Sequence, residues 1–220
     1  MNTIKIYILL PVLSLSLLLG CTSSTPNTRA IFLLLDTSGT YTQEMDKAQA
    51  IINYLLSTLN SGDSIAVAKI DSGSFSEKDI IAKSTFDERP SVANDQKRLF
   101  KQQVTNFVKD LKRGSANTDI TGGMVQAADF VKETAAKRKT ILIFSDLEED
   151  LPKGHVRDFP LDVQGIQVVA LNVTKLRSDN IDPRDYKNRL DSWQARITEG
   201  GGSWVVLNDL DRIDQLVSMR

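Results

Sequence analysis

The sequence is poor in cysteine and histidine, with one of each among 220 residues. A zinc site built from several such side chains cannot be assembled within the chain, and neither can an intrachain disulfide. Neither sign of charge is in clear excess, because 28 Asp and Glu stand against 27 Lys and Arg, for a formal net charge of -1. The chain as a whole therefore does not attract nucleic acid electrostatically, and we expect no nucleic-acid partner.

No apolar run is long enough for a membrane-spanning helix, which needs ~20 residues. The run over 6–19 at the N-terminus has 14 residues, follows Lys5 and is interrupted by Pro11. A positive start, a short apolar stretch and the small residue Gly20 predict a cleavable export signal over 1–20. Cys21, the single cysteine of the chain, stands directly after this segment.

The tetrapeptide Leu-Leu-Gly-Cys at this point resembles the lipobox of bacterial lipoproteins. The resemblance implies that Cys21 becomes the first mature residue and carries lipid on its sulfur, and two or three acyl chains anchor a domain firmly. It also implies an extracytoplasmic place on the bacterial cell membrane. Thr22, and not an acidic residue, follows Cys21. In a cell with two membranes, the resemblance therefore implies the outer membrane. A plain secretory signal with an unmodified cysteine is the alternative.

The rest of the chain is expected to form a short polar tether over 21–28 and one folded domain over 29–220. Runs such as RAIFLLL and TILIF are apolar on both faces, which is typical of parallel strands buried on both sides. We expect strands over 29–35, 64–70, 79–85, 140–144, 166–171 and 203–207, and helices over 44–59, 91–113, 121–137, 185–198 and 210–219.

This alternation predicts a Rossmann-like, doubly wound α/β fold, with a mostly parallel sheet and helices on both faces. The connection between the second and third strands is too short to hold a crossover helix. The third strand is therefore predicted to be an antiparallel edge strand.

Oxygen-bearing side chains gather where the carboxyl ends of the strands are expected, which is where such folds place their sites. Asp36, Ser38 and Thr40 follow the first strand, and Asp146 follows the strand over 140–144. Thr118 lies in the loop before the helix over 121–137. Carboxylate and hydroxyl oxygens suit a hard divalent cation, so these loops predict a metal site if the two strands are neighbours.

The motifs DTSGT, TDI and SD, in this order on these elements, resemble the von Willebrand factor A domain and its metal-ion-dependent adhesion site. The family's first motif is Asp-x-Ser-x-Ser, and here Thr40 keeps the last hydroxyl but adds a methyl group. The resemblance spans residues 29–220 and implies that Mg²⁺, or Mn²⁺ or Ca²⁺, is held by Asp36, Ser38, Thr40, Thr118 and Asp146. It further implies a protein partner whose Asp or Glu side chain completes the metal shell.

Three alternatives stay open. Thr121 could supply the second-loop hydroxyl in place of Thr118, although Thr121 is better placed to cap the following helix. Asp36 and Asp146 could merely cap helices, which would leave a metal-free scaffold. The third is a haloacid-dehalogenase-like phosphatase, whose motif is Asp-x-Asp-x-Thr. Ser38 stands at its second Asp and cannot deliver a proton as a tuned carboxyl can, so we expect no enzyme.

Overall fold

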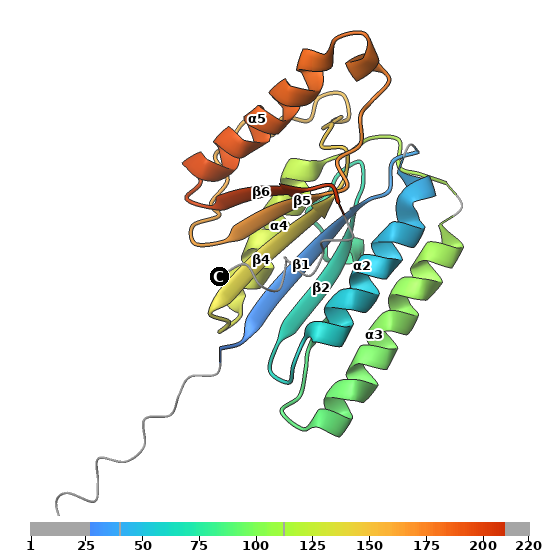
Figure 1. Ribbon diagram of the computed structural model, residues 1–220, viewed down its shortest axis with the longest axis vertical. Helices are drawn as coiled ribbons and strands as arrows, with labels where there is room; N and C mark the ends of the chain where they lie inside the picture. Colours follow the sequence, from blue (N-terminus) through green and yellow to red (C-terminus); the bar gives the residue numbers. More distant parts are fainter. Residues whose placement is uncertain (1–26, 40, 112, 210–220) are drawn as a thin grey trace, which may run out of the picture.

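One sheet of six strands forms the centre of the molecule (Figure 1). The computed structural model describes residues 27–39, 41–111 and 113–209. The strands are β1 (Arg29–Asp36), β2 (Ser64–Ile70), β3 (Ile80–Thr85), β4 (Arg138–Phe144), β5 (Gln167–Leu171) and β6 (Ser203–Leu207). Their order is β3-β2-β1-β4-β5-β6, and β3 alone runs antiparallel to its neighbour. The predicted α/β sheet with one antiparallel edge strand is confirmed.

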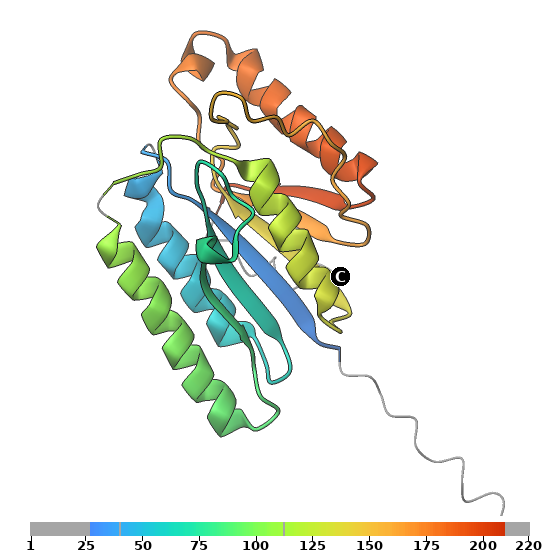
Figure 2. The same cartoon turned by 180° about the vertical axis from the view of Figure 1, so that it is seen from behind.

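Helices cover both faces of this sheet, as predicted (Figures 1 and 2). The described helices are α2 (Met45–Thr58), α3 (Pro90–Asp110), α4 (Ile120–Glu133) and α5 (Pro183–Glu199), with short 3-10 helices η2 (Thr42–Glu44), η3 (Glu77–Asp79) and η4 (Ser178–Asn180). The pair α2 and α3 lies on one face, and α4 and α5 lie on the other. The predicted helix over 210–219, the export signal and Cys21 fall outside the described residues.

The period-two alternation of the strands divides their side chains between two apolar cores. In β1, Phe32 and Leu34 pack on the α4 side, while Leu33 and Leu35 pack on the α2 side. All four side chains are fully buried, which explains why the sequence of this strand is apolar without interruption. None of the helices in the described part of the chain has both the length and the apolar character needed to cross a membrane.

The topology brings the ends of β1 and β4 together. These strands pair in parallel, with Leu35 opposite Phe144, so Asp36 at the end of β1 lies beside the start of the loop after β4. The strand order also reverses here, because β1 connects through α2 to β2 on one side while β4 lies on the other. Open α/β sheets form a crevice at such a switch point. The pairing of β1 with β4 confirms that the two strands are neighbours, which is the condition set for the predicted metal site.

Candidate metal centre

Asp36 is fully buried and its carboxylate is held from two directions. The main-chain N–H of Ser38 donates to Oδ1 at 2.8 Å, and the hydroxyl of Ser145 donates to Oδ2 at 2.7 Å. Burial raises the pKa of Asp36, although these donors oppose the rise because they favour the charged form. The side chain is thus fixed at the sheet edge in an orientation set by two different loops.

Ser145 links the first and third loops, a role that its place before Asp146 in the sequence does not predict. Its hydroxyl donates to Asp36 and accepts the main-chain N–H of Leu147 at 3.0 Å. Leu147 is buried with φ 66, a left-handed conformation that is unusual for leucine. Its carbonyl accepts the indole N–H of Trp193 from α5 at 3.0 Å. The third loop therefore holds a strained turn that packing against α5 stabilises.

Asp146 is the second buried carboxylate, with 4% of its surface exposed. Its Oδ1 accepts the main-chain N–H of Glu148 at 3.0 Å. Burial raises the pKa of Asp146 to about 6, and the negative charge of Asp36 adds to the rise. The charge of Asp36 thus acts on Asp146, as expected for side chains at the ends of neighbouring strands.

Arg189 lies near this region but does not neutralise it. Its Nε donates to the main-chain oxygen of Asp146 at 2.9 Å, while its Nη2 forms an ion pair with Asp179 at 2.9 Å. Among residues 27–209 as far as they are described, no basic side chain forms an ion pair with either Asp36 or Asp146. The two buried carboxylates therefore have no ion-pair partner in this part of the chain, and the charge of Arg189 only partly offsets the raised pKa of Asp146.

Main-chain hydrogen bonds join the second loop to both of the others. Thr118 is buried and exchanges two such bonds with Asp150, at 2.7 and 3.0 Å. On the other side, the N–H of Ser115 donates to the carbonyl of Thr37 at 2.7 Å, next to the bridge between Ser38 and Ser115. The three loops that carry the predicted ligands thus form one connected unit.

The predicted cap of α4 was wrong. Asp119, not Thr121, is the N-cap, and its carboxylate accepts the N–H of Gly122 at 2.8 Å. An aspartate directly before the helix can reach the free N–H groups of the first turn, whereas Thr121 already lies inside that turn. The hydroxyl of Thr121 instead accepts a hydrogen bond from Arg196 at 2.8 Å. The hydroxyl of Thr121 is thus engaged with α5, and Thr118 stays the predicted ligand of the second loop.

The residues that the structure describes fit a small hard cation. Asp36, Ser38, Thr118 and Asp146 lie on loops that are bonded to one another, and two uncompensated carboxylates favour a positive ion. Neither aspartate is the N-cap of a described helix, so the capping alternative has no support there. Thr40 falls outside the described residues, and its role stays a prediction. Within the described ranges, no three or more Asp, Glu, His or Cys side chains form a metal-binding group, so a cation here would also need hydroxyl ligands.

No family model matches the chain, and no curated protein matches it. Among solved structures, an aerotolerance-related membrane protein from Bacteroides fragilis NCTC 9343, crystallised with multiple mutations to serines, gives a TM-score of 0.45 at 16% identity over 88% of this chain and 99% of that one. The conserved hypothetical protein BatB from Bacteroides thetaiotaomicron gives 0.46 at 16% identity over 87% and 96%.

The three N-terminal domains of the type V pili tip protein Mfa5 from Porphyromonas gingivalis give a TM-score of 0.38 at 15% identity, over 54% of this chain and 20% of that one. At these values no functional conclusion passes from those proteins to this chain. The case for a metal centre comes from the side chains of the chain itself.

Proposed function

We propose that the chain is an exported, lipid-anchored protein-binding module that holds a divalent cation and uses it to bind an acidic side chain of a partner. The observation that carries this proposal is the pair of buried carboxylates, Asp36 and Asp146, with no ion-pair partner among the described residues. Two negative carboxylates buried near each other are unfavourable unless a positive ion lies between them or one of them is protonated.

In this proposal Mg²⁺ is the first choice of cation, with Mn²⁺ and Ca²⁺ as alternatives, and the ligands are Asp36, Ser38, Thr40, Thr118 and Asp146. A bound cation would supply a positive centre that attracts a carboxylate. The chain's own residues orient the ligands: Ser145 fixes Asp36, and Arg189 holds the main chain at Asp146. Two protein carboxylates only balance a doubly charged ion, so an incoming Asp or Glu would not meet excess negative charge.

Titration calorimetry with MgCl₂ and MnCl₂ tests the metal site. We expect the wild-type chain to bind one ion, and Asp36→Asn to abolish that heat because it removes one of two anionic ligands. Glu148→Gln is the matched control, since Glu148 lies in the third loop but its side chain is 58% exposed. Equal heats from wild type and Asp36→Asn would refute the proposed centre.

Partner binding requires a separate experiment. We expect a pull-down from a membrane extract to recover the partner with Mg²⁺ present and to lose it when a chelator is added. Recovery that is equal with and without chelator, and equal for Asp36→Asn, would favour the metal-free scaffold instead.

We propose no catalytic role. Ser38 stands where a haloacid-dehalogenase-like phosphatase carries its second aspartate, and a serine cannot serve as general acid near neutral pH. Hydrolysis of p-nitrophenyl phosphate that disappears in Asp36→Asn would contradict this and support the phosphatase alternative.

The lipid anchor is proposed at Cys21, on the extracytoplasmic side of the bacterial cell membrane. We expect labelled palmitate to enter the wild-type chain but not Cys21→Ser, and the variant to leave the membrane fraction. The anchor and the metal centre would lie at opposite ends of β1, because the tether leads to Arg29 and Asp36 ends the strand. Eight extended residues span ~26 Å, so the centre would face away from the membrane.

A further inference from the structure

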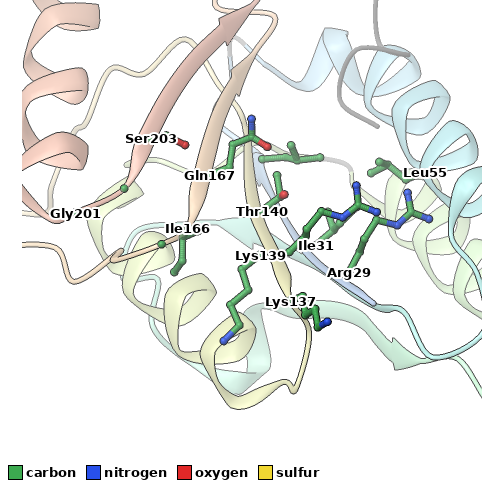
Figure 3. A pocket seen from close by; sticks show the side chains of 14 residues that line it. Arg29, Ile31, Leu55, Lys137, Lys139, Thr140, Ile166, Gln167, Gly201 and Ser203 are labelled. Atoms are coloured by element: carbon green, nitrogen blue, oxygen red, sulfur yellow. The ribbon is translucent and has the colours of Figure 1, made fainter. Parts of the chain in front are cut away.

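A second polar site lies at the opposite end of the central strands, where β1 and β4 begin (Figure 3). It is a cavity of about 370 Å³ on the α2 side of the sheet. Arg29, Lys137, Arg138 and Lys139 line it, and the described residues around it include no acidic side chain. Because the charged side chains of this lining are all cationic, the cavity favours an anionic occupant.

Two of these cations, Arg29 and Arg138, are direct neighbours across the sheet. Arg29 in β1 pairs with Arg138 in β4, so the two side chains extend from adjacent points. Like charges at directly opposite positions destabilise a sheet. Arg29 is balanced by Asp63, which it contacts through Nη2 at 2.8 Å and through Nε at 3.0 Å.

Arg138 has no such compensation. Its Nε is buried without a hydrogen-bond partner, and within the described ranges no carboxylate forms an ion pair with its guanidinium. A buried donor without an acceptor is rare in folded proteins and calls for an explanation such as an unseen ion. With Arg29 balanced by Asp63, the guanidinium of Arg138 is a positive charge without a counter-charge among the described residues.

The remaining polar groups of the cavity are suited to a multi-oxygen anion. Figure 3 shows Thr140, Gln167 and Ser203 on the same side of the sheet as Leu55 of α2. No described helix covers β5 and β6 on this side of the sheet (Figure 1). Lys139 is turned away from it, because its ammonium donates to the carbonyl of Lys132 at 3.4 Å.

We infer that this cavity is a binding site for a phosphate group, held by the guanidinium of Arg138 with Arg29, Lys137 and the hydroxyls of Thr140 and Ser203 around it. A guanidinium binds phosphate through two parallel N–H···O bonds, and the other phosphate oxygens can accept from the hydroxyls. The phosphate is either free or the headgroup of an anionic lipid. The site lies at the end of the sheet where the tether joins β1, which favours the lipid headgroup. The choice of a lipid rests on the proposed anchor, whereas binding of free phosphate does not depend on that anchor.

Thermal unfolding of the full-length chain in neutral detergent tests the site. We expect sodium phosphate, at ionic strength held constant with chloride, to raise the Tm of the wild type in a saturable manner. Arg138→Gln should weaken the apparent affinity for phosphate at least tenfold, with each Tm shift measured against the same variant without phosphate. Lys153→Gln, an exposed lysine elsewhere, is the matched control and should respond as the wild type does. Equal phosphate affinity in Arg138→Gln and wild type, or no response to phosphate, would overturn the inference.

Asp36→Asn separates this inference from the metal centre. That variant should lose the response to MgCl₂ and keep the response to phosphate, because the two sites lie at opposite ends of β1. A missing response to MgCl₂ would therefore contradict only the metal centre, and a missing response to phosphate only the phosphate site.

Reconstitution identifies the source of the phosphate. The full-length chain is placed in vesicles of phosphatidylcholine alone or with one third phosphatidylglycerol, and acetylation of Lys137 and Lys153 is followed by mass spectrometry. A lipid headgroup at the site should slow acetylation of Lys137 severalfold in the anionic vesicles, in the wild type but not in Arg138→Gln. A phosphate response without this protection supports the site and assigns it free phosphate. A phosphate response that appears only after deletion of residues 210–220 would give the cavity to the chain's own C-terminal segment and overturn the inference.

Discussion

The surroundings of Asp146 change the pKa of its side chain strongly. Burial and the charge of Asp36 raise the pKa of Asp146 from 3.8 to about 6. The folded chain therefore binds this proton more tightly than the unfolded chain does. Without a cation, the contribution of Asp146 to stability is most favourable below the unfolded pKa and is lost as the pH rises through about 6. The loss is on the order of 3 kcal/mol when one pKa unit is taken as 1.36 kcal/mol.

The first prediction follows from this sign. At pH 7 without metal, Asp146→Asn should be more stable than the wild type by ~1–3 kcal/mol, because a neutral amide replaces a charge that burial disfavours. The difference should shrink as the pH falls from about 6 towards 4, because the folded wild type then binds the proton that the unfolded chain still lacks. Urea unfolding between pH 4 and 7 measures both effects, with Asp110→Asn as the control at an exposed carboxylate. A difference independent of pH would contradict the raised pKa.

Ser145 is the residue whose loss should affect the metal centre without changing its charge. Ser145→Ala removes the donor to Asp36 and leaves the buried N–H of Leu147 without an acceptor. We expect a loss of ~1–3 kcal/mol in the free energy of unfolding and weaker Mg²⁺ binding. Urea unfolding and calorimetry check the two parts, and Ser57→Ala, at an exposed serine of α2, should alter neither.

At the scale of elements, α5 holds the third loop in place. Trp193 donates to the carbonyl of Leu147, and Arg189 donates to that of Asp146 while pairing with Asp179 before the helix. The side chains of Arg189 and Asp179 are 9% and 0% exposed, so the pair is largely shielded from water. The guanidinium of Arg189 lowers the pKa of Asp179 through its hydrogen bonds, which marks the aspartate as charged in the folded chain.

Breaking this pair on one side should be costly. Arg189→Met leaves Asp179 as an unpaired buried charge, and we expect a loss of ~3–5 kcal/mol at pH 7. The double variant Arg189→Met, Asp179→Leu should recover much of that stability, because no unpaired charge is left. Because the paired aspartate has a lowered pKa, its stabilising effect is present above its ordinary value and is lost as the pH falls through the folded value. Urea unfolding of the single and double variants tests this, and equal losses in both would contradict it.

At the scale of the whole molecule, one sheet is shared by two apolar cores, so we expect the two cores to unfold together. Phe100 of α3 is buried on one side, whereas Trp193 and Trp204 both belong to the core on the other side. Phe100→Ala should cost ~3–5 kcal/mol and should shift the tryptophan fluorescence transition as far as the circular dichroism transition. Two transitions that separate would show that the halves are independent. Ala substitution at Leu99, which is 61% exposed in the same helix, is the control.

Local patterns were sufficient to predict the fold and the neighbourhood of the site. The apolar run of β1 and the short link before β3 are properties of nearby residues, and Asp36 and Asp146 take their places from the strands they follow. The roles of Ser145 and Arg189 could not be predicted, because they depend on contacts between loops and helices far apart in the chain. The cross-strand contact of Arg138 likewise depends on register, which the sequence does not reveal. Metal binding, Thr40 and the lipid on Cys21 stay predictions.

The place of β1 has a mechanical consequence. If the chain is fixed at its N-terminus and holds a partner beside Asp36, tension between the two acts along β1 from Arg29 to its last residue. The strand is flanked on both sides by parallel neighbours, with seven paired positions on each. Such a load acts in shear, so it strains both ladders of hydrogen bonds together and does not open them one at a time. Pulling across the sheet at β3, which has a strand on one side only, would peel it away at lower force.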